Sequence, residues 1–290
     1  MKAIKNFLIT SLILLMSTGV LNAGKPVKAL IVTGQNNHNW QVSSVILQKY
    51  LNESGIFTAD LAISPKKGED MSAFRPDFSA YKVIVLDYNG DAWSDETNSA
   101  FLKYVKNGGG VVVYHAANNA FRKWKEYNEI IGLGGWEDRN ETDGPYVYFQ
   151  DGKEVRDTSP GPGGSHGKKH EFKIALRNKK HPITKGLPET WTHSRDELYD
   201  RLRGPAKNLT ILATAYSDKN TGGTGRDEPT LMVINWGRGR IFHTVLGHVG
   251  GEQAHPAIDG ASFIVTFLRG AEWAATGKVT LKVPDDFPGK

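Results

Sequence analysis

The chain has 290 residues, no cysteine and a formal net charge of +5 at neutral pH. The lack of cysteine excludes disulfide bonds and every mechanism that uses a cysteine nucleophile. The basic residues are spread along the chain rather than gathered in a block, so a nucleic acid is not expected as a partner. The length is enough for one large α/β domain or two small domains.

The first 23 residues have the composition of a secretory signal peptide. Lys2 and Lys5 precede an apolar run from Phe7 to about Met16, and smaller residues then lead to Ala23. The apolar run is shorter than the roughly 20 residues of a membrane-spanning helix. We therefore expect cleavage after Ala23, a periplasmic or secreted protein, and no membrane span in the mature chain. An uncleaved membrane anchor is the alternative, whereas the lack of cysteine excludes a lipoprotein.

The first half of the mature chain alternates between strand and helix patterns. Ser94 is in position to cap a helix that Asn107 and Gly108 would end. Short apolar runs with helical patterns between them predict a parallel sheet with helices on both faces. We expect strands at residues 27–34, 57–63, 81–87 and 111–114, and helices at 42–55 and 94–107.

The second half begins with an irregular stretch, rich in glycine, proline and charged residues, at about residues 136–170. This stretch contains one expected strand, Tyr146–Gln150. Because apolar strand runs resume after it, we interpret it as an insertion beside the site and residues 24–290 as a single domain. Further strands are expected from Phe172 and at 209–215, 230–236 and 239–247, and a last helix at about Ala261–Ala275.

Polar segments that end strands or open loops contain the candidate catalytic residues. Because the loops after parallel strands gather at one edge of a sheet, His38, His115 and His248 are expected to converge. Histidine suits proton transfer near neutral pH, and Asp196 or Glu197 would fix its tautomer. Each residue has a structural alternative: the histidines can satisfy buried polar groups, and the two acids can form an ordinary solvated pair.

Other histidines and tryptophans are candidates on weaker grounds. His166 and His170 have a spacing that suits metal ligands, but their glycine-rich surroundings favour a surface loop. His243 and His255 are interpreted as structural. Three tryptophans lie in the irregular segments: Trp40, Trp136 and Trp191. Their rings would either stack on a sugar or join the core.

Five segments, in this order, resemble the trehalose-utilisation (ThuA-like) family: "ALIVTGQNNHNW", "GGGVVVYHAANNAF", "HPITKGLP", "DELY" and "GRGRIFHTVLGH". The resemblance runs from about Val27 to Ala275. It implies a class I glutamine-amidotransferase-like fold, which is a flavodoxin-like, mostly parallel α/β sheet. In the amidotransferases the corresponding strand-to-helix turn carries a catalytic cysteine, and "VYHAA" places His115 there. The chain departs from the family at Gly135–Asp138, where many relatives have a His-Pro pair.

The resemblance implies a carbohydrate substrate, in particular a 3-keto sugar or 3-keto glycoside that a partner sugar dehydrogenase would form. The mechanistic hypothesis is proton abstraction next to the ketone, by His115 or His248, as in a lyase or an isomerase. The other histidine or a divalent metal would stabilise the enediolate, and the sequence contains no nucleotide-cofactor motif. The catalytic candidates are His115, His248, Asp196 and Glu197, and the candidates for sugar binding are His38, Trp40, Asn118, Trp136 and Tyr199.

Two other functions remain open at this point. A non-catalytic sugar-binding module would use the same edge of the sheet and its tryptophans. A serine hydrolase is disfavoured, because no Gly-x-Ser-x-Gly turn is present and His115 occupies the elbow position.

Overall fold

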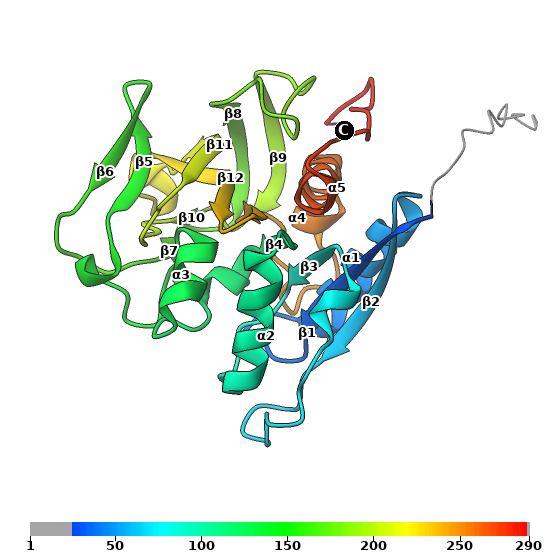
Figure 1. Ribbon diagram of the computed structural model, residues 1–290. Coiled ribbons are helices and arrows are strands. Elements are labelled where there is room, and N and C mark those ends of the chain that lie inside the picture. Colours follow the sequence, from blue (N-terminus) through cyan, green and yellow to red (C-terminus); the bar gives the residue numbers. More distant parts are fainter. Residues whose placement is uncertain (1–24, 289–290) are drawn as a thin grey trace, which may run out of the picture.

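The computed structural model describes residues 25–288, and the predicted signal peptide and its cleavage site lie outside them. One sheet of eleven strands runs through the molecule (Figure 1). Its first half is parallel and has the order β2 (Phe57–Ile63), β1 (Val27–Thr33), β3 (Val83–Leu86), β4 (Gly110–Tyr114) and β13 (Gly239–Thr244).

The second half of the sheet is antiparallel. It continues with β12 (Asp227–Trp236), β11 (Leu209–Tyr216), β8 (His170–Leu176) and β9 (Thr190–Asp196). The hairpin of β5 (Tyr146–Gln150) and β6 (Lys153–Asp157) joins β12 at its side, and β7 (Ser165–His166) pairs with β10 (Tyr199–Asp200) in a separate small sheet. The predicted α/β architecture thus holds, with an antiparallel extension that the sequence pattern did not distinguish.

Helices cover both faces of the sheet. α1 and α5 contact each other on one face, whereas α2 and α3 lie over β13 and β12 on the other (Figure 1). The helices are α1 (Trp40–Glu53), α2 (Asp95–Lys106), α3 (Lys125–Ile131), α4 (Pro256–Asp259) and α5 (Ala261–Thr276), with 3₁₀ turns at Phe78–Ala80, His115–Asn119, Glu141–Asp143 and Lys219–Thr221. Over residues 25–288, no helix is both long enough and apolar enough to cross a membrane.

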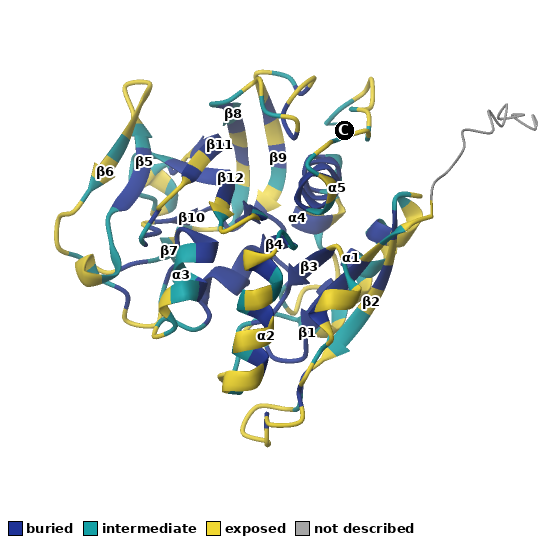
Figure 2. Cartoon of the chain, viewed as in Figure 1, coloured by how far each residue is buried: buried dark blue, intermediate teal, exposed yellow. Residues whose placement is uncertain are grey.

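The central strands are buried because both of their faces are covered. Every residue of β3 and β4 is buried, as Figure 2 shows, and their valine-rich sequences are typical of such strands. The Ser94 hydroxyl accepts a hydrogen bond from the Thr97 amide and caps α2, as the sequence predicts. These rigid strands fix the positions of the loops that leave their carboxyl ends.

Two local features differ from the sequence-based expectations. No strand was expected at Thr190–Asp196, where Trp191 was assigned to an irregular segment, but these residues form strand β9, with buried side chains that include Trp191 and His193. After β4 the chain does not enter an α-helix directly. It makes the 3₁₀ turn His115–Asn119, and α3 begins only at Lys125.

Candidate functional site

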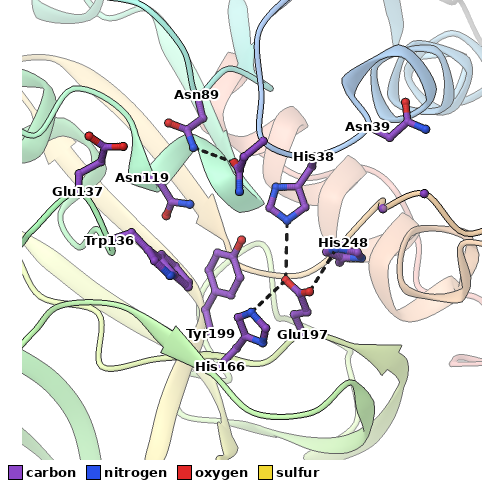
Figure 3. Close-up of a pocket in the computed structure, with 13 residues that line it drawn as sticks. His38, Asn39, Asn89, Asn119, Trp136, Glu137, His166, Glu197, Tyr199 and His248 are labelled. Atoms are coloured by element: carbon purple, nitrogen blue, oxygen red, sulfur yellow. Dashed lines mark hydrogen bonds and ion pairs between the residues drawn. The ribbon is translucent and has the colours of Figure 1, made fainter.

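A pocket of about 550 Å³ lies where the loops after β1 and β13 meet the β9–β10 corner (Figure 3). The predicted convergence of three histidines is present in the structure. The His38 ring lies 4.8 Å from the His115 ring and 4.8 Å from the His248 ring, measured between centroids. The pocket is lined by Asn37, His38, Asn39, Asn89, Asn119, Trp136, Glu137, His166, Glu197, Tyr199, His248, Gly250 and Gly251.

His115 occupies a strained elbow directly after β4. Its φ of 44° lies in the left-handed region, which a non-glycine residue adopts at a cost of about 1–3 kcal/mol. Its Nδ1 donates to the Val245 carbonyl oxygen at 2.6 Å, so in the neutral ring Nε2 carries the lone pair. Burial, together with the neighbouring His38 and His248, holds the pKa of His115 well below its usual range. The His115 ring is therefore neutral at neutral pH.

A chain of polar contacts orients His38. The Asn36 Oδ1 atom accepts from the His38 amide at 3.0 Å and lies 3.4 Å from His38 Nδ1. Asn36 in turn donates to the Asp87 carboxylate at 3.0 Å. Burial raises the pKa of Asp87 to about 7, and hydrogen bonds from Ser43 and Asn36 oppose this rise. These contacts direct Nε2 of His38 toward the pocket.

Glu197 lies at the centre of the imidazoles (Figure 3). Its Oε2 is 3.7 Å from His38 Nε2, 3.9 Å from His115 Nε2 and 3.8 Å from His166 Nε2. Its Oε1 is 3.3 Å from His248 Nε2 and 3.7 Å from Lys169 Nζ. Burial alone would raise the pKa of Glu197, but these basic neighbours outweigh it and hold the pKa below its usual range. The carboxylate is ionised at neutral pH.

His248 is the predicted base that reaches the pocket. Burial lowers its pKa, and the charge of Glu197 only partly offsets that effect. The ring is therefore neutral at neutral pH and able to accept a proton. His115, the other candidate base, is buried behind the pocket and does not line it.

Asp196, predicted to be catalytic, lies below the site and holds it in place. Its carboxylate is fully buried and accepts from the amides of Glu197 at 2.7 Å, Gly247 at 2.7 Å and His248 at 3.2 Å. It also accepts from His193 Nε2 at 2.9 Å. With its oxygens occupied in this way, Asp196 joins the β9–β10 corner to the loop after β13.

Tyr199 and Trp136, both candidates for sugar binding, form the aromatic wall of the pocket. Tyr199 stacks on His115 with ring centroids 4.3 Å apart, and Trp136 meets Tyr199 edge-on at 4.6 Å. Burial and the charge of Glu197 raise the pKa of Tyr199 well above its usual range, so the phenol stays protonated. Trp136, Glu137 and Asp138 all have φ between 50° and 57°, an unusual left-handed run at the pocket rim.

Two predicted sugar-binding residues do not line this pocket. The buried Asn118 side chain lies 3.1 Å from the imidazole of His243, and its neighbour Asn119 reaches the pocket instead. Trp40 lies in an adjacent hollow, which shares Asn37, Asn89 and Glu137 with the pocket. Both differences arise because successive residues of a tight turn or helix start point in different directions.

Other residues also depart from their predicted places. His166 was expected on a surface loop, but pairing of β7 with β10 brings it to Glu197. Trp191 belongs to the core, where its indole donates to Ser262 at 2.7 Å. His243 is structural as expected, because it is buried and hydrogen-bonded to the Ile131 carbonyl oxygen.

Comparisons with known proteins agree with this geometry. The model of the ThuA family, described as trehalose utilisation, matches residues 28–274. The crystal structure of a ThuA-like protein from Parabacteroides merdae is 60% identical in sequence, with a TM-score of 0.89, over 91% of this chain and 95% of that one. A ThuA-like protein from Bacteroides uniformis shares the fold, at 20% identity and a TM-score of 0.56, over 89% of this chain and 95% of that one. No curated protein sequence gives a significant match. Because the family model covers most of its length, this chain belongs to the ThuA (trehalose utilisation) family.

Proposed function

We propose that the chain is an exported enzyme that removes a proton next to the ketone of a 3-keto sugar or 3-keto glycoside. The observation that favours this function is one pocket in which the neutral imidazole of His248 lies 3.3 Å from the ionised carboxylate of Glu197. Such groups can accept a proton from a substrate at neutral pH without prior ionisation. Membership of a carbohydrate-utilisation family supports a sugar as the substrate.

The pocket has the chemistry of a sugar site. Amide side chains at Asn37, Asn89 and Asn119 offer both donors and acceptors to hydroxyl groups. Trp136 provides an apolar ring of the kind that packs against a sugar face. Figure 3 shows Asn89, Asn119 and Trp136 on one side of the pocket, opposite His248. A sugar bound between them would place its ring carbons near the imidazoles.

We assign the role of base to His248. A ketone at C3 makes the proton on C2 acidic, and transfer of that proton to His248 leaves an enediolate across C2 and C3. Glu197, at 3.3 Å from Nε2, stabilises the imidazolium as it forms. The electron pair then expels the C1 substituent and forms a C1–C2 double bond, which is a lyase reaction. Alternatively, C2 is reprotonated, which is an epimerase or isomerase reaction.

Tyr199 is suited to act as a hydrogen-bond donor in this reaction. Its hydroxyl points into the pocket in Figure 3, and the raised pKa keeps its proton in place. A neutral donor that faces a developing oxyanion stabilises the transition state more than the ground state. We place the C3 oxygen on this side of the pocket.

The 3-keto substrate requires an earlier oxidation. The chain has no nucleotide-binding motif in its sequence, so a separate sugar dehydrogenase would supply the ketone. Because the sequence predicts an export signal, we propose that the reaction takes place in the periplasm or outside the cell.

The test is a product assay on the mature chain with a panel of 3-keto glucosides in D₂O. We expect release of the aglycone or deuterium at C2, and the His248→Gln variant should be about 10²–10⁴-fold slower. His170→Gln is the matched control, because His170 bonds the Lys168 carbonyl oxygen and does not line the pocket. Unchanged turnover in His248→Gln would show that the base is assigned wrongly. Binding of unoxidised glycans without any product would instead identify a sugar-binding module, for which the amide and tryptophan wall would suffice.

A further inference from the structure

We propose that His38, His115 and Glu197 bind one divalent transition-metal ion, such as Zn²⁺, at the floor of the pocket. The three ligands would be His38 Nε2, His115 Nε2 and the Oε2 atom of Glu197. The proposal deepens the proposed function, since the ion would face the sugar, but its evidence and its first test are independent of any reaction.

The three ligand atoms lie around one point, and the site would contract when an ion binds. The candidate ligand atoms of these three residues lie within 4.8 Å of one another. Glu197 Oε2 is 3.7 Å from His38 Nε2 and 3.9 Å from His115 Nε2. Zinc bonds of about 2.0–2.1 Å in a tetrahedron put ligand atoms roughly 3.3–3.5 Å apart. The two Glu197–histidine distances would shorten by about 0.2–0.6 Å, and a pair 4.8 Å apart would shorten by about 1.3–1.5 Å, so the side chains would move toward one another when the ion binds.

The other ring nitrogens of both histidines are already positioned by the protein. Nδ1 of His115 donates to the Val245 carbonyl oxygen, and Nδ1 of His38 faces the Asn36 side chain that Asp87 holds. This arrangement directs the lone pairs on Nε2 toward Glu197. Metal-binding histidines commonly have such a partner on the second nitrogen, which fixes the tautomer and the orientation of the ring.

His115 Nε2 supplies an independent observation. The atom is buried and has no hydrogen-bond partner among residues 25–288. An unsatisfied buried acceptor costs about 1–3 kcal/mol, so a protein retains one only when something compensates. A bound metal ion would satisfy this lone pair and would also explain why the residue is held at a strained φ.

The ligand set selects the kind of ion. Two imidazoles and one carboxylate suit zinc and other divalent transition metals, whereas magnesium and calcium prefer oxygen ligands. Three protein ligands leave at least one coordination position free, which is typical of catalytic rather than structural sites. His166, 3.8 Å from the same carboxylate oxygen but 37% exposed, lies beside this open side.

The two oxygens of Glu197 would then have different tasks. Oε2 would bind the ion, and Oε1 would remain beside His248 and Lys169. His248 would thus be left free as the base, and a bound ion would supply Lewis-acid stabilisation to the enediolate oxygens. A sugar with adjacent carbonyl and hydroxyl oxygens is the substrate class that such an ion favours.

The test is metal binding by the purified mature chain after removal of any affinity tag and dialysis against EDTA. We expect titration calorimetry to show one Zn²⁺ per chain, and Co²⁺ to give visible d–d absorption bands. His38→Ala and Glu197→Gln should each weaken Zn²⁺ binding by at least about 100-fold, more than the loss of an outer partner. His170→Ala is the control and should bind as the wild type does.

Absence of stoichiometric binding, or equal binding by His38→Ala and the wild type, would overturn the proposal. His115→Ala is a third variant, and a circular dichroism spectrum must show that it folds. These measurements contain no substrate, so they separate the metal site from the proposed function. Turnover that persists in EDTA would refute the metal and leave the proton abstraction standing.

Discussion

Asp196 and Glu197 are adjacent acids with different tasks, and amide substitutions should separate these tasks. Asp196 Oδ1 accepts from the amides of Glu197 and His248, and Oδ2 accepts from the Gly247 amide and His193 Nε2. In Asp196→Asn one oxygen becomes an NH₂ group. In the Oδ1 position this group faces two backbone amides, and two hydrogen bonds are lost. In the Oδ2 position it loses the bond from the Gly247 amide but can donate to His193 Nε2, which accepts in the other tautomer.

The magnitude follows from these bonds. A hydrogen bond to a charged acceptor contributes about 1.5–3 kcal/mol, so the loss is about 1.5–3 kcal/mol for one bond and about 3–6 kcal/mol for two, before the structure relaxes. We therefore expect Asp196→Asn to lower the free energy of unfolding by about 2–5 kcal/mol. Activity should fall as well, because the backbones of Glu197 and His248 lose their shared anchor.

Glu197→Gln should behave in the opposite way. Its carboxylate faces the pocket at 3.3–3.9 Å from the surrounding side-chain nitrogens and anchors no backbone amide. We expect a change of no more than about 1 kcal/mol in unfolding free energy, together with a large loss of activity.

Urea unfolding in EDTA measures this difference without a contribution from bound metal. Midpoints should be converted to free energies with the fitted slope of each variant. Equal destabilisation of Asp196→Asn and Glu197→Gln would refute the separation of tasks. So would an Asp196→Asn variant with wild-type stability.

Three further predictions concern residues around the site. Burial raises the pKa of Glu228 from 4.5 to about 7. The stabilisation that this group contributes to the folded state is therefore full below pH 4.5 and is lost as the pH rises through 7. Glu228→Gln should therefore exceed the wild type in unfolding free energy by about 3 kcal/mol at pH 8 and match it near pH 4, in urea titrations at both pH values. Gly164 has a φ of +83°, and a Cβ there would lie 2.5 Å from the Trp136 backbone nitrogen. Because Trp136 is a proposed sugar contact, Gly164→Ala should raise KM for the sugar more than it lowers kcat in steady-state assays. Asn36→Ala should weaken Zn²⁺ binding by about 10–100-fold in calorimetry while its stoichiometry stays at one, because His38 loses its outer partner.

The parts of the fold that the sequence predicted well are those in which one physical rule dominates. Strands β3 and β4 are buried on both faces, so their apolar runs are unmistakable. Strand β9 was missed because its inward positions include His193 and Asp196, whose polar side chains hide the alternating pattern. The second strand of the β5–β6 hairpin was also missed, although Asp151 and Gly152 form a two-residue turn with φ of 51° and 75°. That Asp-Gly pair is a strong local signal for a hairpin.

The residues of the site likewise divide into those that one physical rule predicts and those that it does not. The loops after parallel strands gather at one edge of a sheet. This was enough to expect that His38, His115 and His248 would meet, because their loops follow β1, β4 and β13. The rule does not extend to His166, which reaches Glu197 only through the pairing of β7 with β10 across the insertion. Nor does it distinguish Asp196 from Glu197, since that difference depends on which side chain of the corner turns inward.

The elbow after β4 supports the proposed proton transfer over acyl transfer. A nucleophile at this turn has to reach the substrate, yet the His115 ring is covered by Tyr199 and lies behind the pocket wall. Its Nδ1 is held by Val245, and its Nε2 points at Glu197. The strained turn therefore fixes a ligand or a neighbour of the carboxylate instead of presenting a reactive atom. The side chains that line the pocket come instead from the facing segments, at Glu197, Tyr199 and His248, and they are of the kinds that can move protons and stabilise charge.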